Sequence, residues 1–249
     1  MASSKDHNCI DDEKLIKDIK EFGWAVIMIE ATDYLPSFSY TIGLWKNYNH
    51  PELIAFGLTT KTLHSILNIG GALAKEGAIL QTGREYEDFF DNGSTQFINV
   101  DKRNIKDYLG YAIWFNKTNE FPVLQLIWTD RKGKYPWDKS FEEEFVYRQP
   151  LLDRNADFKF REKKNGAVFT TRQWLEQHKP ILRVVHDDDG EWQFLTGDQV
   201  IDDIRIVALE QMVIKDPTLN DIFNLDYNEE AERNFIGDEW VRNSSKDEE

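Results

Sequence analysis

Apolar residues in the first half of the chain alternate between helical and extended spacing. From a cap at Asp11 or Asp12 to about Phe22 they recur every three or four positions, which predicts an amphipathic helix ended by Gly23. Helical spacing returns at 60–75, after a cap by Thr59 or Thr60, and at 105–115. Shorter apolar runs predict strands at 24–29, 38–44, 53–58, 96–100 and 123–128. The uninterrupted run at 24–29 predicts a strand buried on both faces, and Gly70-Gly71 is expected to weaken the middle of the second helix.

A second set of elements follows a charge-dense stretch. This stretch, 139–169, has few aliphatic anchors and predicts a linker or exposed arm. Beyond it, a short helix capped by Thr170 or Thr171 precedes further strands and helices, and a polar tail predicts disorder. The expected strands are 181–185, 192–195 and 204–208, and the expected helices are 209–214 and 218–225. The predicted organisation is a domain at 1–138, the linker at 139–169, a small module at 170–242 and the tail at 243–249.

The mixture of elements determines the expected fold class. Strands and helices are intermixed without a regular βαβ repeat, which predicts an α+β domain with a mainly antiparallel sheet and packed helices. The smaller α+β module follows it. Sixteen Phe, nine Tyr and eight Trp supply large side chains for the core.

Composition also restricts the location. No apolar run approaches the roughly 20 residues of a bilayer-spanning helix, and the polar N-terminus lacks a signal-peptide pattern. The sole cysteine, Cys9, excludes an intrachain disulfide. We therefore expect a cytoplasmic protein, from a bacterium, that is not bound to a membrane.

The net charge of −15 is concentrated in the second half of the chain. Residues 1–150 carry 17 Lys and Arg against 22 Asp and Glu, and residues 151–249 carry 13 against 23. Such a surface repels phosphate backbones, which disfavours nucleic acid and anionic membranes as partners. The charge serves either solubility or attraction of a basic protein partner. The candidate acidic partner surface consists of Asp187, Asp188, Asp189, Asp198, Asp202 and Asp203.

His50-Pro51-Glu52 is the best chemical candidate. A histidine and a carboxylate two residues apart can share a proton in general acid–base work. In the alternative interpretation His50 caps backbone groups and Glu52 faces solvent. The neighbouring Tyr40, Thr41 and Gly43 are candidate contacts for a ligand or partner, although the glycine is also explained by packing.

Other motifs do not point to catalysis. Asp187-Asp188-Asp189-Gly190 lacks the alternating ligands and final glutamate of a calcium loop, and we interpret it as a hairpin turn. The histidines show no zinc-hydrolase spacing, and the glycine-rich motifs of phosphate loops and nucleophile elbows are absent. We therefore predict no catalytic residues, no metal and no cofactor.

Several motifs together resemble a known family. They are Gly23-Trp24, Phe38-x-Tyr40-Thr41-x-Gly43-Leu44, His50-Pro51-Glu52-Leu53, Gly57-Leu58 and Gln125-Leu126-x-Trp128-x-Asp130-x-x-Gly133-x-x-Pro136-Trp137. In this order and spacing they resemble the bacterial domain of unknown function 4262 over about 21–137. That resemblance implies no particular activity.

The second module more weakly resembles domain of unknown function 2185, the immunity-protein-33-like group. The matching residues are Trp192-x-Phe194-x-x-Gly197-Asp198, Asp216-Pro217-x-Leu219-x-x-Ile222 and Ala231-Glu232-Arg233. This resemblance implies a cytoplasmic, acidic, non-catalytic inhibitor that covers a cognate toxin.

Three functions remain open at this point. The first is a non-catalytic protein-binding module of toxin-immunity type with a basic partner. The second is a small-molecule-binding or hydrolytic domain that uses the loop around His50 and Glu52. The third is a scaffolding or oligomerising role, and the sequence does not predict the oligomeric state.

Overall fold

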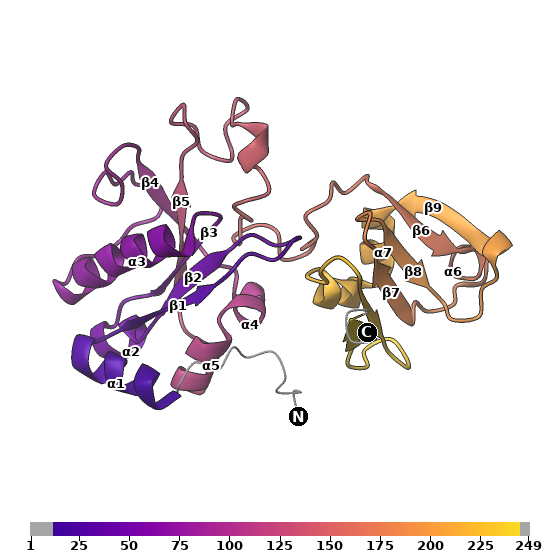
Figure 1. Ribbon diagram of the computed structural model, residues 1–249, viewed down its shortest axis with the longest axis horizontal. Coiled ribbons are helices and arrows are strands. Elements are labelled where there is room, and N and C mark those ends of the chain that lie inside the picture. The colour runs from indigo at the N-terminus through magenta and orange to yellow at the C-terminus, as the bar shows by residue number, and fades with distance from the viewer. Residues whose placement is uncertain (1–11, 245–249) are drawn as a thin grey trace. The chain divides into compact units, whose positions relative to one another are not determined.

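The chain folds into two compact units. Unit 1 comprises Met1–Glu30 and Pro36–Ala156, and unit 2 comprises Ala31–Leu35 and Asp157–Glu249. The computed structural model describes residues 12–244, so Cys9, the capping candidate Asp11 and residues 245–249 of the predicted tail (243–249) lie outside the described residues. Each unit combines helices with one mainly antiparallel sheet, which confirms the predicted α+β class (Figure 1).

Unit 1 is built on a five-stranded sheet with the order β1-β2-β3-β5-β4. β3 and β5 are parallel, and the other neighbours are antiparallel. The elements are α1 (Asp12–Phe22), β1 (Ala25–Ile29), β2 (Phe38–Ile42), α2 (Leu44–Tyr48), β3 (Glu52–Phe56), α3 (Thr60–Lys75), β4 (Thr95–Asn99), α4 (Ile105–Tyr108), α5 (Gly110–Asn116) and β5 (Val123–Trp128), with 3₁₀ turns η1 (Lys102–Asn104) and η2 (Glu143–Phe145).

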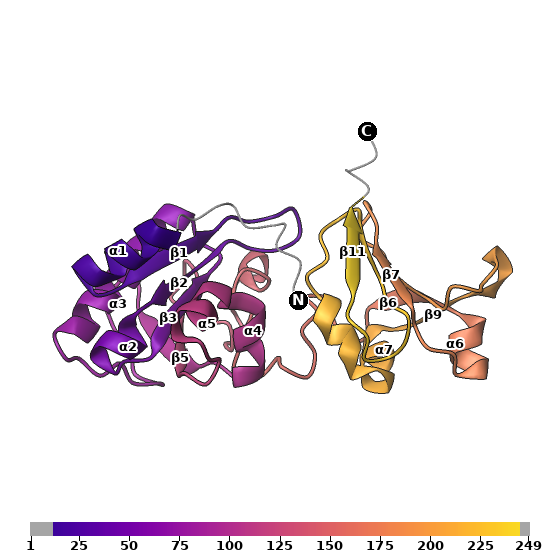
Figure 2. The ribbon, with the colours of Figure 1, turned by 90° about the horizontal axis from the view of Figure 1, so that it is seen from below.

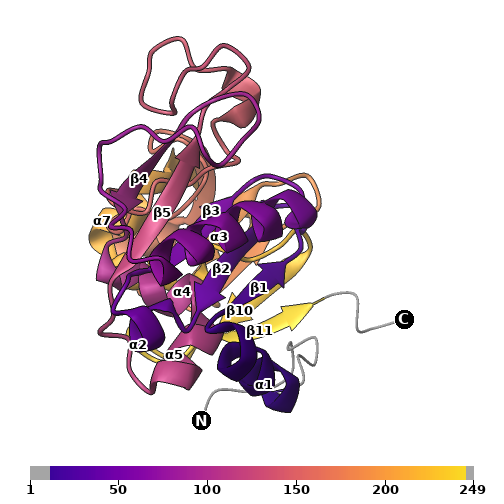
Figure 3. The same cartoon turned by 90° about the vertical axis from the view of Figure 1, so that its left-hand side faces the viewer.

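The alternation of side chains along each strand creates two cores, one on either face of this sheet. On β3, Leu53 and Ala55 pack in the core that contains α3, whereas Ile54 and Phe56 pack in the core that contains α1, α4 and α5. Figure 3 shows α3 on one side of the strands and α1 and α5 on the other. Every residue of β3 and β5 is buried, as expected for the interior strands of a sheet covered on both faces.

Two sequence predictions for unit 1 differ from the structure. β1 is an edge strand in which Ile27 is the buried residue and Met28 is 48% exposed, so burial on both faces was a wrong prediction. A continuous apolar run does not reveal whether a strand has one neighbour or two. The helix predicted at 105–115 is divided into α4 and α5, because Leu109 has non-helical backbone angles (φ −109°, ψ 41°).

Gly70 and Gly71 allow α3 to lie close to the sheet. A Cβ atom at Gly70 would lie 2.4 Å from Cδ1 of Leu53, and one at Gly71 would lie 2.3 Å from Cε2 of Trp24. The low helix propensity of the pair is therefore compensated by packing.

We expect Gly71→Ala to lower the free energy of unfolding of unit 1 by about 1–3 kcal/mol, since the added methyl group overpacks against Trp24. On helix propensity alone the same change would stabilise the helix by about 1 kcal/mol. Urea unfolding followed by circular dichroism measures whether the substitution lowers or raises the free energy of unfolding. Gly110→Ala is the control because a Cβ atom there meets open space. A stabilised Gly71→Ala protein would contradict the packing role.

The predicted linker at 139–169 is not an exposed arm, and the boundary between the units divides it. Its first part is fastened to β5 by two glutamines. The side chain of Gln125 accepts from the backbone N–H of Leu152 at 3.0 Å, and that of Gln149 accepts from the N–H of Trp128 and donates to its carbonyl, each at 3.0 Å. Phe145 and Leu152 are also buried in the two cores of unit 1, so apolar packing and hydrogen bonds together hold this part of the segment.

Unit 2 is built on a six-stranded sheet with the order β11-β10-β7-β8-β6-β9. β6 and β8 are parallel, and the other neighbours are antiparallel. Figure 2 shows β7 and β6 between β11 and β9. The elements are β6 (Ala167–Thr171), α6 (Arg172–Gln177), β7 (Arg183–His186), β8 (Trp192–Leu195), β9 (Ile204–Ala208), α7 (Leu209–Lys215), β10 (Glu229–Glu232) and β11 (Val241–Ser244), with 3₁₀ turns η3 (Ile201–Asp203) and η4 (Pro217–Ile222). β11 includes the first two residues of the predicted tail.

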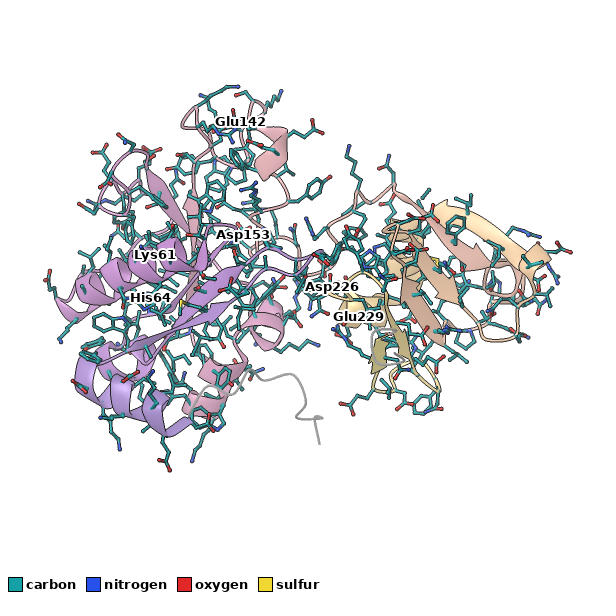
Figure 4. The ribbon with its side chains drawn as sticks, in the orientation of Figure 1. Lys61, His64, Glu142, Asp153, Asp226 and Glu229 are labelled. Atoms are coloured by element: carbon teal, nitrogen blue, oxygen red, sulfur yellow. The ribbon has the colours of Figure 1, made fainter. Side chains whose placement is uncertain are left out.

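The short segment Ala31–Leu35 belongs to unit 2 because Tyr34 is buried there. Its ring makes edge contacts with His186 at 4.6 Å and with Trp192 at 6.0 Å between centroids, and its hydroxyl donates to the carboxylate of Glu162. The backbone N–H of Tyr34 donates to Asp226, which Figure 4 labels.

A buried ion pair joins η4 to the end of β10. The guanidinium of Arg233 hydrogen bonds to the carboxylate of Asp216, and the two side chains are 0% and 4% exposed. Arg233 also donates to the carbonyl of Ile181 at 2.9 Å and to the hydroxyl of Thr218 at 2.6 Å, and it lies over the ring of Trp240. The charge of Arg233 is thus compensated inside the unit.

Candidate functional site

The candidate residues around His50 surround α2, a five-residue helix between β2 and β3. Gly43 precedes this helix with φ 109°, a conformation that disfavours side chains. A Cβ atom there would lie 3.0 Å from the carbonyl oxygen of Gly23. The sequence Thr41-Ile42-Gly43-Leu44 therefore provides a sharp change of direction from strand to helix.

Glu52, at the start of β3, caps the N-terminal end of α2 although it follows that helix in the sequence. Its Oε1 accepts from the N–H groups of Gly43 at 2.8 Å and Trp45 at 3.2 Å, and its Oε2 accepts from the hydroxyl of Thr41 at 2.7 Å. The Thr41 hydroxyl in turn accepts from the N–H of Leu53 at 2.8 Å. Gly43 has no capping side chain of its own, so the carboxylate satisfies donors that the short helix leaves unpaired.

The environment of Glu52 opposes its ionisation. The side chain is 0% exposed, and burial raises its pKa to about 7, although the hydrogen bonds from Thr41, Trp45 and Gly43 act to lower it. A buried carboxyl group with a neutral-range pKa is a feature of many catalytic sites. Here every hydrogen-bond partner of the carboxylate belongs to the strand-to-helix junction, so the geometry indicates a structural cap.

His50 does not share a proton with Glu52. Its Nδ1 lies 2.7 Å from the carbonyl oxygen of Pro51, which makes Nδ1 the protonated nitrogen. Nε2 is buried and has no hydrogen-bond partner among the described residues. Burial lowers the pKa of His50, and the Pro51 carbonyl acts in the opposite direction. The predicted acid–base pair is therefore two independent side chains.

The remaining candidate residues of this group are also inside unit 1. Tyr40 is 2% exposed, and its hydroxyl accepts from the N–H of Tyr111 at 3.3 Å; burial raises its pKa. Thr41 is fully buried. The structure thus brings Thr41, Gly43 and Glu52 together at the junction of β2, α2 and β3, whereas Tyr40 packs in the core that contains α5.

Asp130, the acidic residue of the family-like motif after β5, also organises backbone. Its carboxylate accepts from the N–H groups of Lys132 and Lys134 at 2.8 Å and of Glu142 at 3.0 Å, and Figure 4 labels Glu142 in this loop. Burial raises the pKa of Asp130, but these three donors outweigh burial and hold it below its usual value.

The predicted acidic surface is divided between the two ends of β8. Asp187, Asp188 and Asp189 form the turn that precedes β8. Asp187 accepts from the N–H of Glu191 at 2.8 Å and from the amide of Gln193 at 3.2 Å, which fixes the turn. The side chains of Asp188 and Asp189 are exposed.

Asp198, Asp202 and Asp203 follow the other end of β8. Asp198 forms an ion pair with Lys179, whose hydrogen bond lowers the pKa of the carboxyl group. Asp203 is 6% exposed; hydrogen bonds from the N–H of Val200 and the amide of Gln173 lower its pKa to about 2. Asp203 therefore supports the loop before β9 from inside.

One group of surface residues was not predicted from the sequence. Lys20, Lys46 and Lys117 line a pocket of about 710 Å³ together with Tyr48 and Trp114. These residues come from α1, α2 and the end of α5, so no local motif connects them. Only the fold brings them together.

The comparisons with known proteins identify the family of unit 1. No helix among residues 12–244 combines the length and hydrophobicity that a membrane crossing requires, and no group of three or more potential metal ligands occurs in that range. No curated protein and no solved structure matches the chain. The family model described as Domain of unknown function (DUF4262) matches residues 18–142, which confirms the resemblance predicted for about 21–137. The chain therefore belongs to the DUF4262 family.

Proposed function

We propose that this protein is a non-catalytic bacterial protein of toxin-immunity type, acting in the cytoplasm, whose unit 2 binds a basic protein partner. The observation that carries the proposal is the fixed acidic turn before β8. Asp187 is held by hydrogen bonds to Glu191 and Gln193, while Asp188 and Asp189 extend into solvent. A preorganised turn with two free carboxylates suits a partner that carries lysines or arginines.

The charge of unit 2 supports the same interpretation. Its residues include 12 Lys and Arg against 23 Asp and Glu, whereas the rest of the chain contains 18 against 22. Long-range attraction by this excess accelerates association with a basic protein. The burial of Glu52 and the separate hydrogen bonding of His50 favour this function over hydrolysis at the His50–Glu52 loop.

The test is affinity capture from the native bacterium at low salt, followed by purification of the captured basic protein and titration by calorimetry. We expect Asp188→Asn/Asp189→Asn to weaken binding about fivefold or more, and we expect added salt to weaken it further. Glu87→Gln/Asp88→Asn in unit 1 removes the same charge and is the matched control. Coexpression should relieve any growth inhibition that the partner causes.

Two results would refute the proposal. One is binding that strengthens with salt, because ionic contacts cannot carry such a complex. The other is equal binding by both double variants, which would place the interface away from the turn.

A further inference from the structure

A basic pocket in unit 1 lies at the junction of α1, α2 and α5. Figures 1 and 3 show these three helices at the same end of the unit. Its volume is about 710 Å³, within the usual range for sites that take small organic molecules. The pocket is distinct from the acidic turn of unit 2.

The charge of this pocket is opposite to that of the chain as a whole. Lys20, Lys46 and Lys117 line it, and none of the described residues along its wall is acidic. Three other surface pockets of unit 1 each contain an aspartate: Asp18, Asp130 or Asp153. No ion pair joins the three lysines to a carboxylate of residues 12–244, so their charges are available to a ligand.

Aromatic and aliphatic side chains form most of the remaining wall, and Gly23 and Asn47 complete it. Trp114 is 43% exposed, and Nζ of Lys46 lies 4.8 Å from the ring centroid of Phe115. Ile16 and Ile19 add aliphatic surface. An exposed indole next to ammonium groups provides both a stacking surface and a counter-charge.

The α2 side of the pocket is held rigidly. The amide of Asn47 donates to the carbonyl of Gly23 at 2.6 Å, and a Cβ atom at Gly23 would lie 1.7 Å from the hydroxyl oxygen of Tyr48. Glycine at position 23 therefore allows Tyr48 to reach the end of α1. The carboxylate of Glu52 caps the N-terminal end of the same helix. Preorganisation of this kind reduces the cost of ligand binding.

From these observations we propose that unit 1 binds a small organic anion with a flat apolar body, whose acidic group contacts Lys20, Lys46 and Lys117 and whose body packs on Trp114. The shared chemistry is an acidic head, such as a carboxylate, sulfonate or phosphate, on an aromatic framework. The three exposed lysines supply positive charge without a fixed geometry, so they select for the negative charge of the head group more than for its shape.

The experiment uses the full chain and anilinonaphthalene sulfonate as an anionic aromatic probe. Binding is followed by the fluorescence of the probe and by the quenching of tryptophan fluorescence. We expect saturable binding at one site that weakens as salt is added. The triple variant Lys20→Gln/Lys46→Gln/Lys117→Gln should bind about tenfold more weakly. Trp114→Leu should weaken binding about fivefold and reduce the quenching of tryptophan fluorescence.

Matched controls distinguish binding in the pocket from a general effect of net charge. Lys61→Gln/Lys132→Gln/Lys134→Gln makes the same change in net charge at other places, including Lys61 on α3 (Figure 4), and should bind as the unmodified protein does. Phenylnaphthylamine, the same ring system without the sulfonate, should bind more weakly.

Three outcomes would overturn the inference: no saturable binding, equal binding of the neutral compound, or equal losses in the two triple variants. Circular dichroism of each variant ensures that the comparison is made between folded proteins. Because the acidic turn is untouched, failure here leaves the proposed partner of unit 2 unaffected.

Discussion

Replacing Arg233 by methionine should lower the free energy of unfolding of unit 2 by about 3–5 kcal/mol. Methionine retains much of the volume of the side chain but leaves the carboxylate of Asp216 buried, at 4% exposure, without its counter-charge. The hydrogen bonds from Arg233 to Ile181 and Thr218 are lost as well. Hydrogen exchange measured by mass spectrometry on the full chain should show faster exchange in η4 and β10, with peptides of unit 1 unchanged.

Arg183→Met is the matched control for this substitution. Arg183 pairs with Glu230 in the same sheet, but their side chains are 44% and 27% exposed, so we expect a loss of at most about 1 kcal/mol. Asp216→Leu combined with Arg233→Met should recover part of the stability, because neither charge is then left unpaired. Equal effects of Arg233→Met and Arg183→Met would show that burial of the pair does not matter.

Glu52→Ala should lower the free energy of unfolding of unit 1 by about 3 kcal/mol. The variant leaves the N–H groups of Gly43 and Trp45 and the hydroxyl of Thr41 without their acceptor, and it opens a cavity under α2. Glu52→Gln should cost less, since an amide oxygen in the place of Oε1 can still accept from the N–H groups of Gly43 and Trp45. Urea unfolding at about pH 5.5 compares the free energies of unfolding of the two variants. An equal loss of stability in Glu52→Gln and Glu52→Ala would contradict the prediction.

Glu52 should also make stability depend on pH. Burial raises its pKa from 4.5 to about 7, so the folded protein holds a proton in this range that the unfolded chain has released. The resulting stabilisation is complete below pH 4.5 and declines as pH rises. Above pH 7 it is about 3 kcal/mol smaller.

The difference in unfolding free energy between the unmodified protein and Glu52→Gln isolates this effect. Burial lowers the pKa values of His50 and His186, so their contribution to the stability of the protein decreases as pH falls, which is the opposite direction. Both histidines are present in both proteins, so they do not affect the difference. The difference should decrease between about pH 5 and about pH 8. A constant difference would show that Glu52 is ionised throughout, as its three donors alone would favour.

The local sequence pattern was sufficient to predict most helices and strands, but it did not predict which elements lie beside one another. The strands at 123–128, 192–195 and 204–208 and the cap at Thr59 follow from short-range periodicity and capping, and the structure confirms them. The edge position of β1 was not predictable, because it depends on strand order. The packing of the segment near Gln149 depends on hydrogen bonds to β5, which a charge-dense sequence does not reveal.

The sequence by itself determined the α+β class, the family and the acidic excess, because these depend on composition, spacing and motif order. It also selected the residues around His50 and Glu52 but not their role. The tertiary structure decided that role, since capping of α2 depends on a carboxylate that arrives from β3. It also brought Lys20, Lys46 and Lys117 to one pocket from helices far apart in the chain. A side chain's partners are set by three-dimensional packing, and one-dimensional spacing records only those that are near in sequence.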